Sequence, residues 1–130
     1  MKALIMIGEG FEDSEFFYPY YRLQEEGVDV DVASSSTGSL TGKHGYTFEA
    51  NIAFDDVKAD RYDLLVLPGG KGPERIRTDE RSVEIVKTMA EAGKTIASIC
   101  HGAQMLISAG VLEGRRCTSY SGLRDDVTAA

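Results

Sequence analysis

The chain has 130 residues, which is enough for one hydrophobic core. Its formal net charge of −7 disfavours polyanionic partners. We therefore expect a single domain, residues 1–130, that binds neither nucleic acid nor an anionic membrane. No apolar run approaches the roughly 20 residues of a membrane helix, and the start has no signal-peptide pattern. The expectation is a cytoplasmic protein. Cys100 and Cys117 could pair in principle, but that compartment favours free thiols.

The beginning of the chain predicts a β-α-β unit. The apolar run Lys2–Ile7 predicts a buried first strand. A helix follows, with Ser14 as the expected N-cap and Gly27 as the stop. Pro19 lies inside this helix and predicts a kink or a restart, because its ring clashes with the carbonyl four residues earlier. Val28–Ala33 predicts the second strand.

The middle of the chain is less regular. Ser34–Gly45 is polar and glycine-rich and predicts a loop or a short hairpin, and Tyr46–Ala53 is weakly strand-like. Leu64–Leu67 predicts a short, fully buried strand. Asp79 is the expected N-cap of an amphipathic helix that ends at Gly93.

The end of the chain continues the alternation of strands and helices. Thr95–Ile99 predicts a buried strand, Gln104–Ala109 a helix that stops at Gly110, and Arg116–Tyr120 one more strand. Strands that alternate with amphipathic helices are typical of an α/β fold. We therefore predict a flavodoxin-like three-layer sandwich with a mainly parallel sheet.

In such sheets, ligands bind outside the carboxyl ends of the strands. Three loops of this chain follow predicted strands at that edge: Gly8–Asp13, Pro68–Pro73 and Cys100–Gly102. The functional site is expected where these loops meet.

Cys100 stands directly between a predicted strand and a predicted helix. A side chain at such an abrupt turn projects above the sheet edge, close to the N–H groups of the new helix. This setting predicts a thiol pKa below the free value of about 8.5, and hence a reactive thiolate. The position alone fits a buried structural cysteine equally well. Gly102 removes a side chain at the helix start, which would let a substrate approach.

The segment Ala97 to Gln104, which reads Ala-Ser-Ile-Cys-His-Gly-Ala-Gln, resembles the nucleophile elbow of the ThiJ/PfpI superfamily. Leu-Pro-Gly-Gly, residues 67–70, stands upstream where this family has it. The chain is most similar to the PfpI-type intracellular proteases, some of which are also described as deglycases. The resemblance covers essentially the whole chain, but the family fold continues past Asp126. Residues 1–130 are thus expected to lack the family's C-terminal elements.

The resemblance implies roles for four residues. Cys100 would be the nucleophile and His101 its general base, while Glu74 would reach the histidine from a neighbouring subunit of a homo-oligomer. Glu15 would hydrogen-bond the cysteine sulfur, which it can do as a donor only when protonated. Taken without the resemblance, Glu74 fits a solvated surface carboxylate.

The resemblance also implies an oxyanion hole formed by the backbone N–H groups of Gly70 and His101. The residues expected to contact the oxyanion or the substrate are Gly69, Gly70, Glu12, His44 and Tyr120. The glycines match no nucleotide-binding fingerprint, and the histidines and cysteines lack metal-ligand spacing. We therefore expect neither a cofactor nor a metal.

Together these features predict a cysteine-dependent hydrolase that attacks an electrophilic carbonyl. Peptide bonds, glyoxal-derived adducts and methylglyoxal itself all offer such a carbon, so protease, deglycase and glyoxalase-like activities remain open. The alternative is a non-enzymatic stress protein, either redox-sensing or chaperone-like, that uses the same reactive cysteine.

Overall fold

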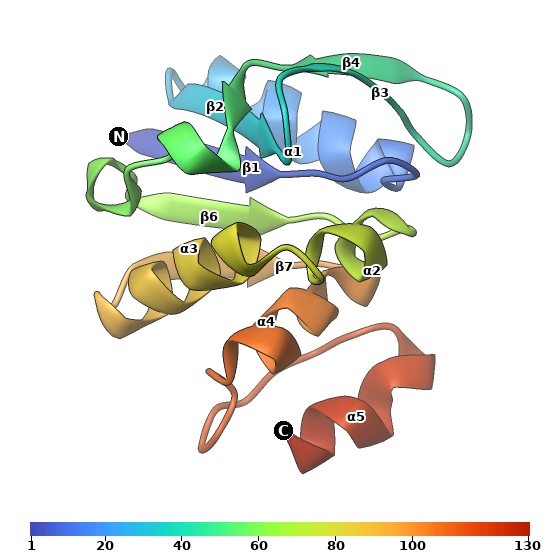
Figure 1. Ribbon diagram of the computed structural model, residues 1–130, viewed down its shortest axis with the longest axis vertical. Coiled ribbons are helices and arrows are strands. Elements are labelled where there is room, and N and C mark those ends of the chain that lie inside the picture. Colours follow the sequence, from blue (N-terminus) through green and yellow to red (C-terminus); the bar gives the residue numbers. More distant parts are fainter.

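The computed structural model describes residues 1–130, and its centre is a five-stranded parallel sheet in the order β5-β2-β1-β6-β7 (Figure 1). The strands are β1 (Lys2–Met6), β2 (Asp29–Ser34), β5 (Ile52–Ala53), β6 (Leu64–Leu67) and β7 (Thr95–Ser98). Apart from the two-residue β5 at one edge, the order reverses once beside β1, as in flavodoxin-like sheets. The predicted α/β fold with a mainly parallel sheet is confirmed.

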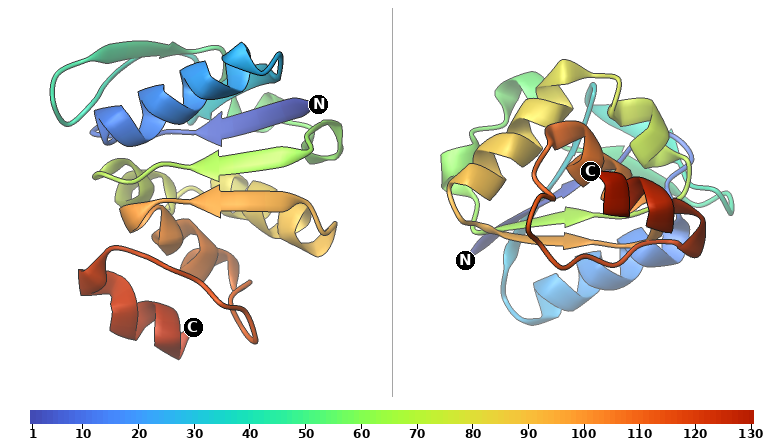
Figure 2. Two further views of the ribbon diagram at one scale, coloured as in Figure 1. Left: turned by 180° about the vertical axis from the view of Figure 1, so that it is seen from behind. Right: turned by 90° about the horizontal axis from the view of Figure 1, so that it is seen from below.

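Helices cover both faces of the sheet (Figure 2). Helix α1 lies on one face, whereas α2, α3 and α4 lie on the other. The helices are α1 (Asp13–Glu25), α2 (Gly72–Ile76), α3 (Glu80–Glu91), α4 (Ala103–Ala109) and α5 (Arg124–Ala129). The 3-10 turns are η1 (Phe54–Asp56), η2 (Ala59–Arg61), η3 (Cys100–Gly102) and η4 (Ser121–Leu123). The longest helix, α1, has 13 residues, so none of the helices could span a membrane.

The two faces of the sheet carry separate hydrophobic clusters, because successive side chains of a strand point to opposite faces. Leu4 and Met6 of β1 belong to the cluster under α3 and α4. Ile5, which lies between them, belongs to the cluster under α1, where Phe16 is fully buried. This alternation gives the three layers of the sandwich.

A β-hairpin extends the layer that holds α1. Its strands are β3 (Gly38–Thr41) and β4 (Thr47–Ala50), which pair antiparallel. The hairpin expected within Ser34–Gly45 thus extends further than predicted: its second strand lies in Tyr46–Ala53, the stretch predicted to be weakly strand-like. Phe48 of β4 packs edge to face on Phe16, with ring centroids 4.8 Å apart. The turn between the two strands, residues 42–46, lies beside the start of α1.

The expected N-cap of α1 is wrong. Glu12, rather than Ser14, is the N-cap: its carboxylate accepts a hydrogen bond from the Glu15 N–H at 2.9 Å, and the Ser14 hydroxyl donates to the same oxygen. The helix also runs through Pro19 without a restart. Stacked rings of Phe16 and Tyr20, with centroids 5.5 Å apart, join the turns on either side of the proline.

The predicted strand Arg116–Tyr120 is wrong as well. This segment is irregular, and β7 is the last strand of the sheet. Arg116, Thr118 and Tyr120 are exposed, so the segment has too little apolar burial to hold it against β7. By contrast, Asp79 caps α3 and Gly110 ends α4 with a left-handed φ of 66°, both as predicted.

Candidate active site

The site lies at the carboxyl ends of β1, β6 and β7, where the order of the sheet reverses. The Glu12 N–H donates to the Gly69 carbonyl at 3.0 Å, and the Lys71 N–H donates to the Gly10 carbonyl at 2.9 Å. These bonds tie the loop after β1 to the loop after β6. The loop after β7 begins at Cys100, which lies against Gly69. The three loops therefore meet, as their places after the strands predict.

Cys100 occupies a strained turn between β7 and α4. It has a φ of 55°, and it is the one residue other than glycine with a positive φ. Such a conformation costs about 1 to 3 kcal/mol, and it persists only where surrounding contacts enforce it. Here the Gly102 N–H donates to the Ile99 carbonyl at 2.7 Å, and the Tyr120 N–H donates to the Cys100 carbonyl at 3.2 Å. The strain falls on the residue predicted to be the nucleophile.

Gly102 is needed for the packing of α4 on the sheet, and not for the expected access of a substrate. A Cβ at this position would clash with the backbone carbonyl oxygen of Leu67, and Gly102 is buried. The glycine thus allows the start of α4 to pack directly on the end of β6, which places the Cys100 turn above the sheet.

We expect Gly102→Ala to lower the free energy of unfolding by about 3 kcal/mol, because backbone atoms on both sides cannot move out of the way. Urea unfolding followed by circular dichroism measures this loss. Gly122→Ala is the matched control, since its Cβ would meet only the half-exposed Tyr120 ring, a side chain that can shift where a backbone carbonyl cannot. Equal urea midpoints for the two variants would contradict the packing role of Gly102.

Three side chains meet around Gly69. The Cys100 sulfur lies 3.3 Å from Nδ1 of His101, and the Gly69 N–H donates to the Glu15 carboxylate at 2.7 Å. A Cβ on Gly69 would lie 2.6 Å from Glu15 Oε2, 2.9 Å from the His101 backbone nitrogen and 3.0 Å from Cys100 Cβ. The structure therefore brings Cys100, His101 and Glu15 together, and only glycine fits among them.

The pKa of the Cys100 thiol is raised, which is opposite to the expected lowering. Burial is the main cause, and the negative charge of the Glu15 carboxylate adds to it. The His101 backbone N–H and the Lys43 ammonium act in the other direction but are weaker. The expected lowering rested on the helix N–H groups and on Glu15 as a protonated donor, and it left out the burial of the thiol and the charge of the carboxylate. The thiolate of Cys100 therefore forms at a higher pH than the thiolate of a free cysteine.

We expect Glu15→Gln to move the alkylation profile of Cys100 to lower pH. The substitution removes a negative charge beside the sulfur, so the thiolate costs less and forms at a lower pH. Iodoacetamide labelling against pH, in a Cys117→Ser background, measures the midpoint. Glu49→Gln, an exposed carboxylate on β4, should leave it in place. A midpoint that stays or rises in Glu15→Gln would show that Glu15 does not disfavour the thiolate.

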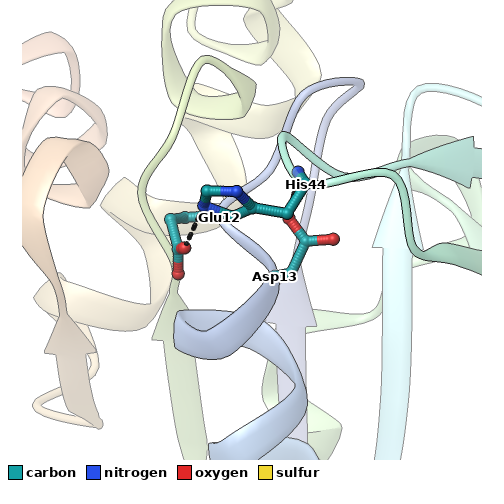
Figure 3. A group of neighbouring side chains, drawn as sticks. All are labelled: Glu12, Asp13 and His44. Carbon is teal, nitrogen blue, oxygen red and sulfur yellow. Dashed lines mark hydrogen bonds and ion pairs between the residues drawn. The ribbon is translucent and has the colours of Figure 1, made fainter.

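Glu12 and His44 pair beside this centre (Figure 3). The Glu12 carboxylate lies 3.1 Å from Nε2 of His44. Burial opposes the charge of Glu12, but hydrogen bonds from Ser14 and from the Glu15 N–H outweigh it and hold the pKa of Glu12 below its usual range. The pair borders an open groove of about 610 Å³, which Phe17, Tyr21 and Tyr46 also line. Of the residues predicted to contact the substrate, Glu12 and His44 therefore line this groove.

Glu12, His44 and Asp13 are also close enough together to ligate a cation (Figure 3). Both Asp13 oxygens already accept backbone N–H groups, and Glu12 caps α1. The positive end of a helix dipole repels a cation, so these contacts favour a structural arrangement over a metal site.

Gly70 and Tyr120 complete the surroundings of the cysteine. Gly70 has a φ of 77°, and its N–H takes part in no backbone hydrogen bond, so it is available to a ligand. The Tyr120 ring stacks on the His101 ring, with centroids 4.7 Å apart. This contact restricts the orientation of the imidazole.

Glu74 is the one predicted catalytic residue that the chain does not bring to the centre. It is exposed on α2, and its carboxylate makes no hydrogen bond or ion pair within the chain. Asp13, in contrast, was not predicted from the sequence. Its contacts join residues 31 and 33 positions apart, and no local motif signals such a contact.

The whole chain, residues 1–130, matches the DJ-1/PfpI family model. It is 57% identical over 130 residues to a protein of Pyrococcus abyssi named as a deglycase, and 54% identical to Deglycase PfpI of Pyrococcus furiosus. Each alignment covers 100% of this chain and 78% of the relative.

Among solved structures, the chain is similar to a two-domain protein of Anabaena variabilis with DJ-1/ThiJ/PfpI-like and ferritin-like domains. The TM-score is 0.97 at 31% sequence identity, over 99% of this chain and 39% of that one. The sequence match, the sheet order and the strained cysteine between β7 and α4 lead to one conclusion: the chain belongs to the DJ-1/PfpI family.

Proposed function

We propose that this protein is a cysteine-dependent hydrolase of the PfpI type that acts on carbonyl electrophiles. The observation that carries the proposal is the Cys100 sulfur, which lies at a strained strand-to-helix turn 3.3 Å from Nδ1 of His101. That distance suits proton transfer from a thiol to an imidazole. The relatives named as deglycases support the same class of reaction.

In the first step, His101 Nδ1 takes the thiol proton while the sulfur attacks the carbonyl carbon of the substrate. The electron pair of the C=O bond moves to oxygen, and the N–H groups of Gly70 and His101 stabilise the resulting oxyanion. When the attacked carbonyl belongs to a peptide bond, its C–N bond then breaks, the leaving amine takes the proton from His101, and water hydrolyses the resulting thioester and restores the thiol. A glyoxal-derived adduct first releases its amine or thiol to give a free aldehyde, to which the sulfur adds. A proton then moves from that carbon to the neighbouring carbonyl carbon, which gives the thioester of a 2-hydroxy acid for the same hydrolysis.

Glu15 controls the charge on the sulfur in this scheme. As a carboxylate it accepts the Gly69 N–H and disfavours the thiolate. When it holds a proton, the same carboxyl becomes a donor to the sulfur and favours the thiolate.

The most specific form of the proposal is deglycation, that is, removal of glyoxal-derived adducts from nucleophilic side chains. The test is an activity panel on chromogenic peptides, methylglyoxal and methylglyoxal-modified thiols and amines, with Cys100→Ser as the blank. Cysteine-dependent turnover of an adduct supports the deglycase, and turnover of peptides alone favours the protease. Conversion of Cys100 to a stable sulfinate without turnover of any substrate would instead favour the redox-sensing protein.

A further inference from the structure

Asp13 is the first residue of α1, and its side chain is only 5% exposed. A carboxylate this deeply buried is costly unless hydrogen bonds compensate for the lost water. Two backbone N–H groups do so: that of His44 donates to Oδ2 at 2.7 Å, and that of Tyr46 donates to Oδ1 at 3.1 Å. Asp13 is thus bonded to the turn between β3 and β4.

The turn is built closely around this carboxylate. A Cβ on Gly42 would clash with Asp13 Oδ1, so only glycine allows the backbone to lie there. The Lys43 N–H donates to the Phe11 carbonyl at 2.7 Å, which ties the turn to the loop after β1. The Asp13 carboxylate is therefore enclosed by the backbone of the turn, which donates two N–H groups to it.

The turn carries groups that face the candidate active site. His44 pairs with Glu12, and His44 and Tyr46 line the groove of about 610 Å³. The Lys43 ammonium lies close enough to Cys100 for its charge to act on the sulfur. Each of these side chains depends on where the turn backbone is held.

We propose that Asp13 is a positioning residue, which fixes residues 42–46 through the His44 and Tyr46 N–H groups and so holds Lys43 and His44 on the substrate side of the site. The effect on catalysis rests on the proposed function, whereas the effect on the turn does not. Asp13 touches neither the sulfur nor the groups that move the proton, so it acts through the turn. Its loss should weaken substrate binding more than it slows the chemical step.

Asp13→Asn is the sharpest variant, because it keeps the shape of the side chain. The amide oxygen can still accept one N–H, but the amide NH₂ meets the other N–H as a second donor. Hydrogen exchange should then be about tenfold faster or more at the His44 and Tyr46 amides, because a charge-assisted hydrogen bond is lost. Asp56→Asn, an exposed carboxylate in η1, is the matched control and should change neither amide.

A second readout is the alkylation profile of Cys100, whose surroundings include Glu15, the His101 N–H and Lys43. Lys43→Met should move the midpoint to higher pH, since a positive charge is lost near the thiolate. Asp13→Asn should move it in the same direction. In the double variant Asp13→Asn should add nothing, because the charge that it positions is already absent.

In the activity assay, Asp13→Asn should lower kcat/KM about tenfold, chiefly by raising KM. If Asp13→Asn unfolds the chain, Gly42→Ala supplies the second variant, since its methyl group displaces the turn from an intact carboxylate. Unchanged exchange at both amides, or additive shifts in the double variant, would overturn the positioning role. An inactive wild type would overturn the proposed function alone, since exchange and alkylation still decide the role of Asp13.

Discussion

Cys100→Ser is expected to lower kcat/KM at least a thousandfold on any substrate that the wild type turns over. A serine hydroxyl is far less acidic than a cysteine thiol, so His101 would remove its proton much less readily. The strained turn would still place the serine oxygen where the sulfur lies, but correct position without an acidic nucleophile is not enough for the reaction. Steady-state kinetics on the adduct series measure the loss.

Cys117→Ser is the matched control for this variant. Both cysteines are free and partly buried, but the Cys117 sulfur hydrogen-bonds only to the Thr118 carbonyl oxygen, at 3.2 Å, and packs at the edge of the core away from His101. We expect its kcat/KM to stay within about twofold of the wild type, as for substitutions away from the reacting atoms. If the two serine variants lost activity equally, neither the elbow nor His101 would mark the nucleophile.

The sheet and its loops could be predicted because their signals are local. The apolar run that became β1 alternates between two cores, with Leu4 facing one and Ile5 the other, and its burial on both faces is what a parallel sheet requires. When parallel strands alternate with helices, the loops that follow the strands all lie at the carboxyl edge of the sheet. Cys100 could therefore be placed at the site before any contact was known.

The finer properties of the site depend on contacts between distant parts of the chain. The pKa of Cys100 is raised partly by Glu15, which lies on α1 and reaches the sulfur across the carboxyl ends of the strands. Asp13 meets a turn more than thirty residues further along the chain. Arg116–Tyr120 has the local pattern of a strand but lacks a partner. In each case, tertiary packing outweighed the local signal.

Glu74 leads to the second large effect, which concerns assembly. Its carboxylate is exposed on α2 and has no partner in its own chain. The His101 imidazole contacts the Cys100 sulfur and stacks on the Tyr120 ring, but no carboxylate is hydrogen-bonded to it. We propose that Glu74 of one subunit orients His101 of the next in a homo-oligomer. Glu74→Ala is then expected to be nearly inactive, although its own chain loses no contact.

Mixing two inactive variants tests this arrangement directly. When Cys100→Ser and Glu74→Ala chains exchange in equal amounts, a mixed interface pairs an intact Cys100 with an intact Glu74. Random pairing in a two-fold assembly makes half of the dimers mixed, with one working site in each, so roughly a quarter of the wild-type activity should return. Mixing Glu74→Ala with a chain that carries both substitutions supplies no intact Glu74 and should restore nothing. If subunit exchange is demonstrated by mass spectrometry and activity still does not return, then Glu74 is a surface carboxylate and His101 works without it.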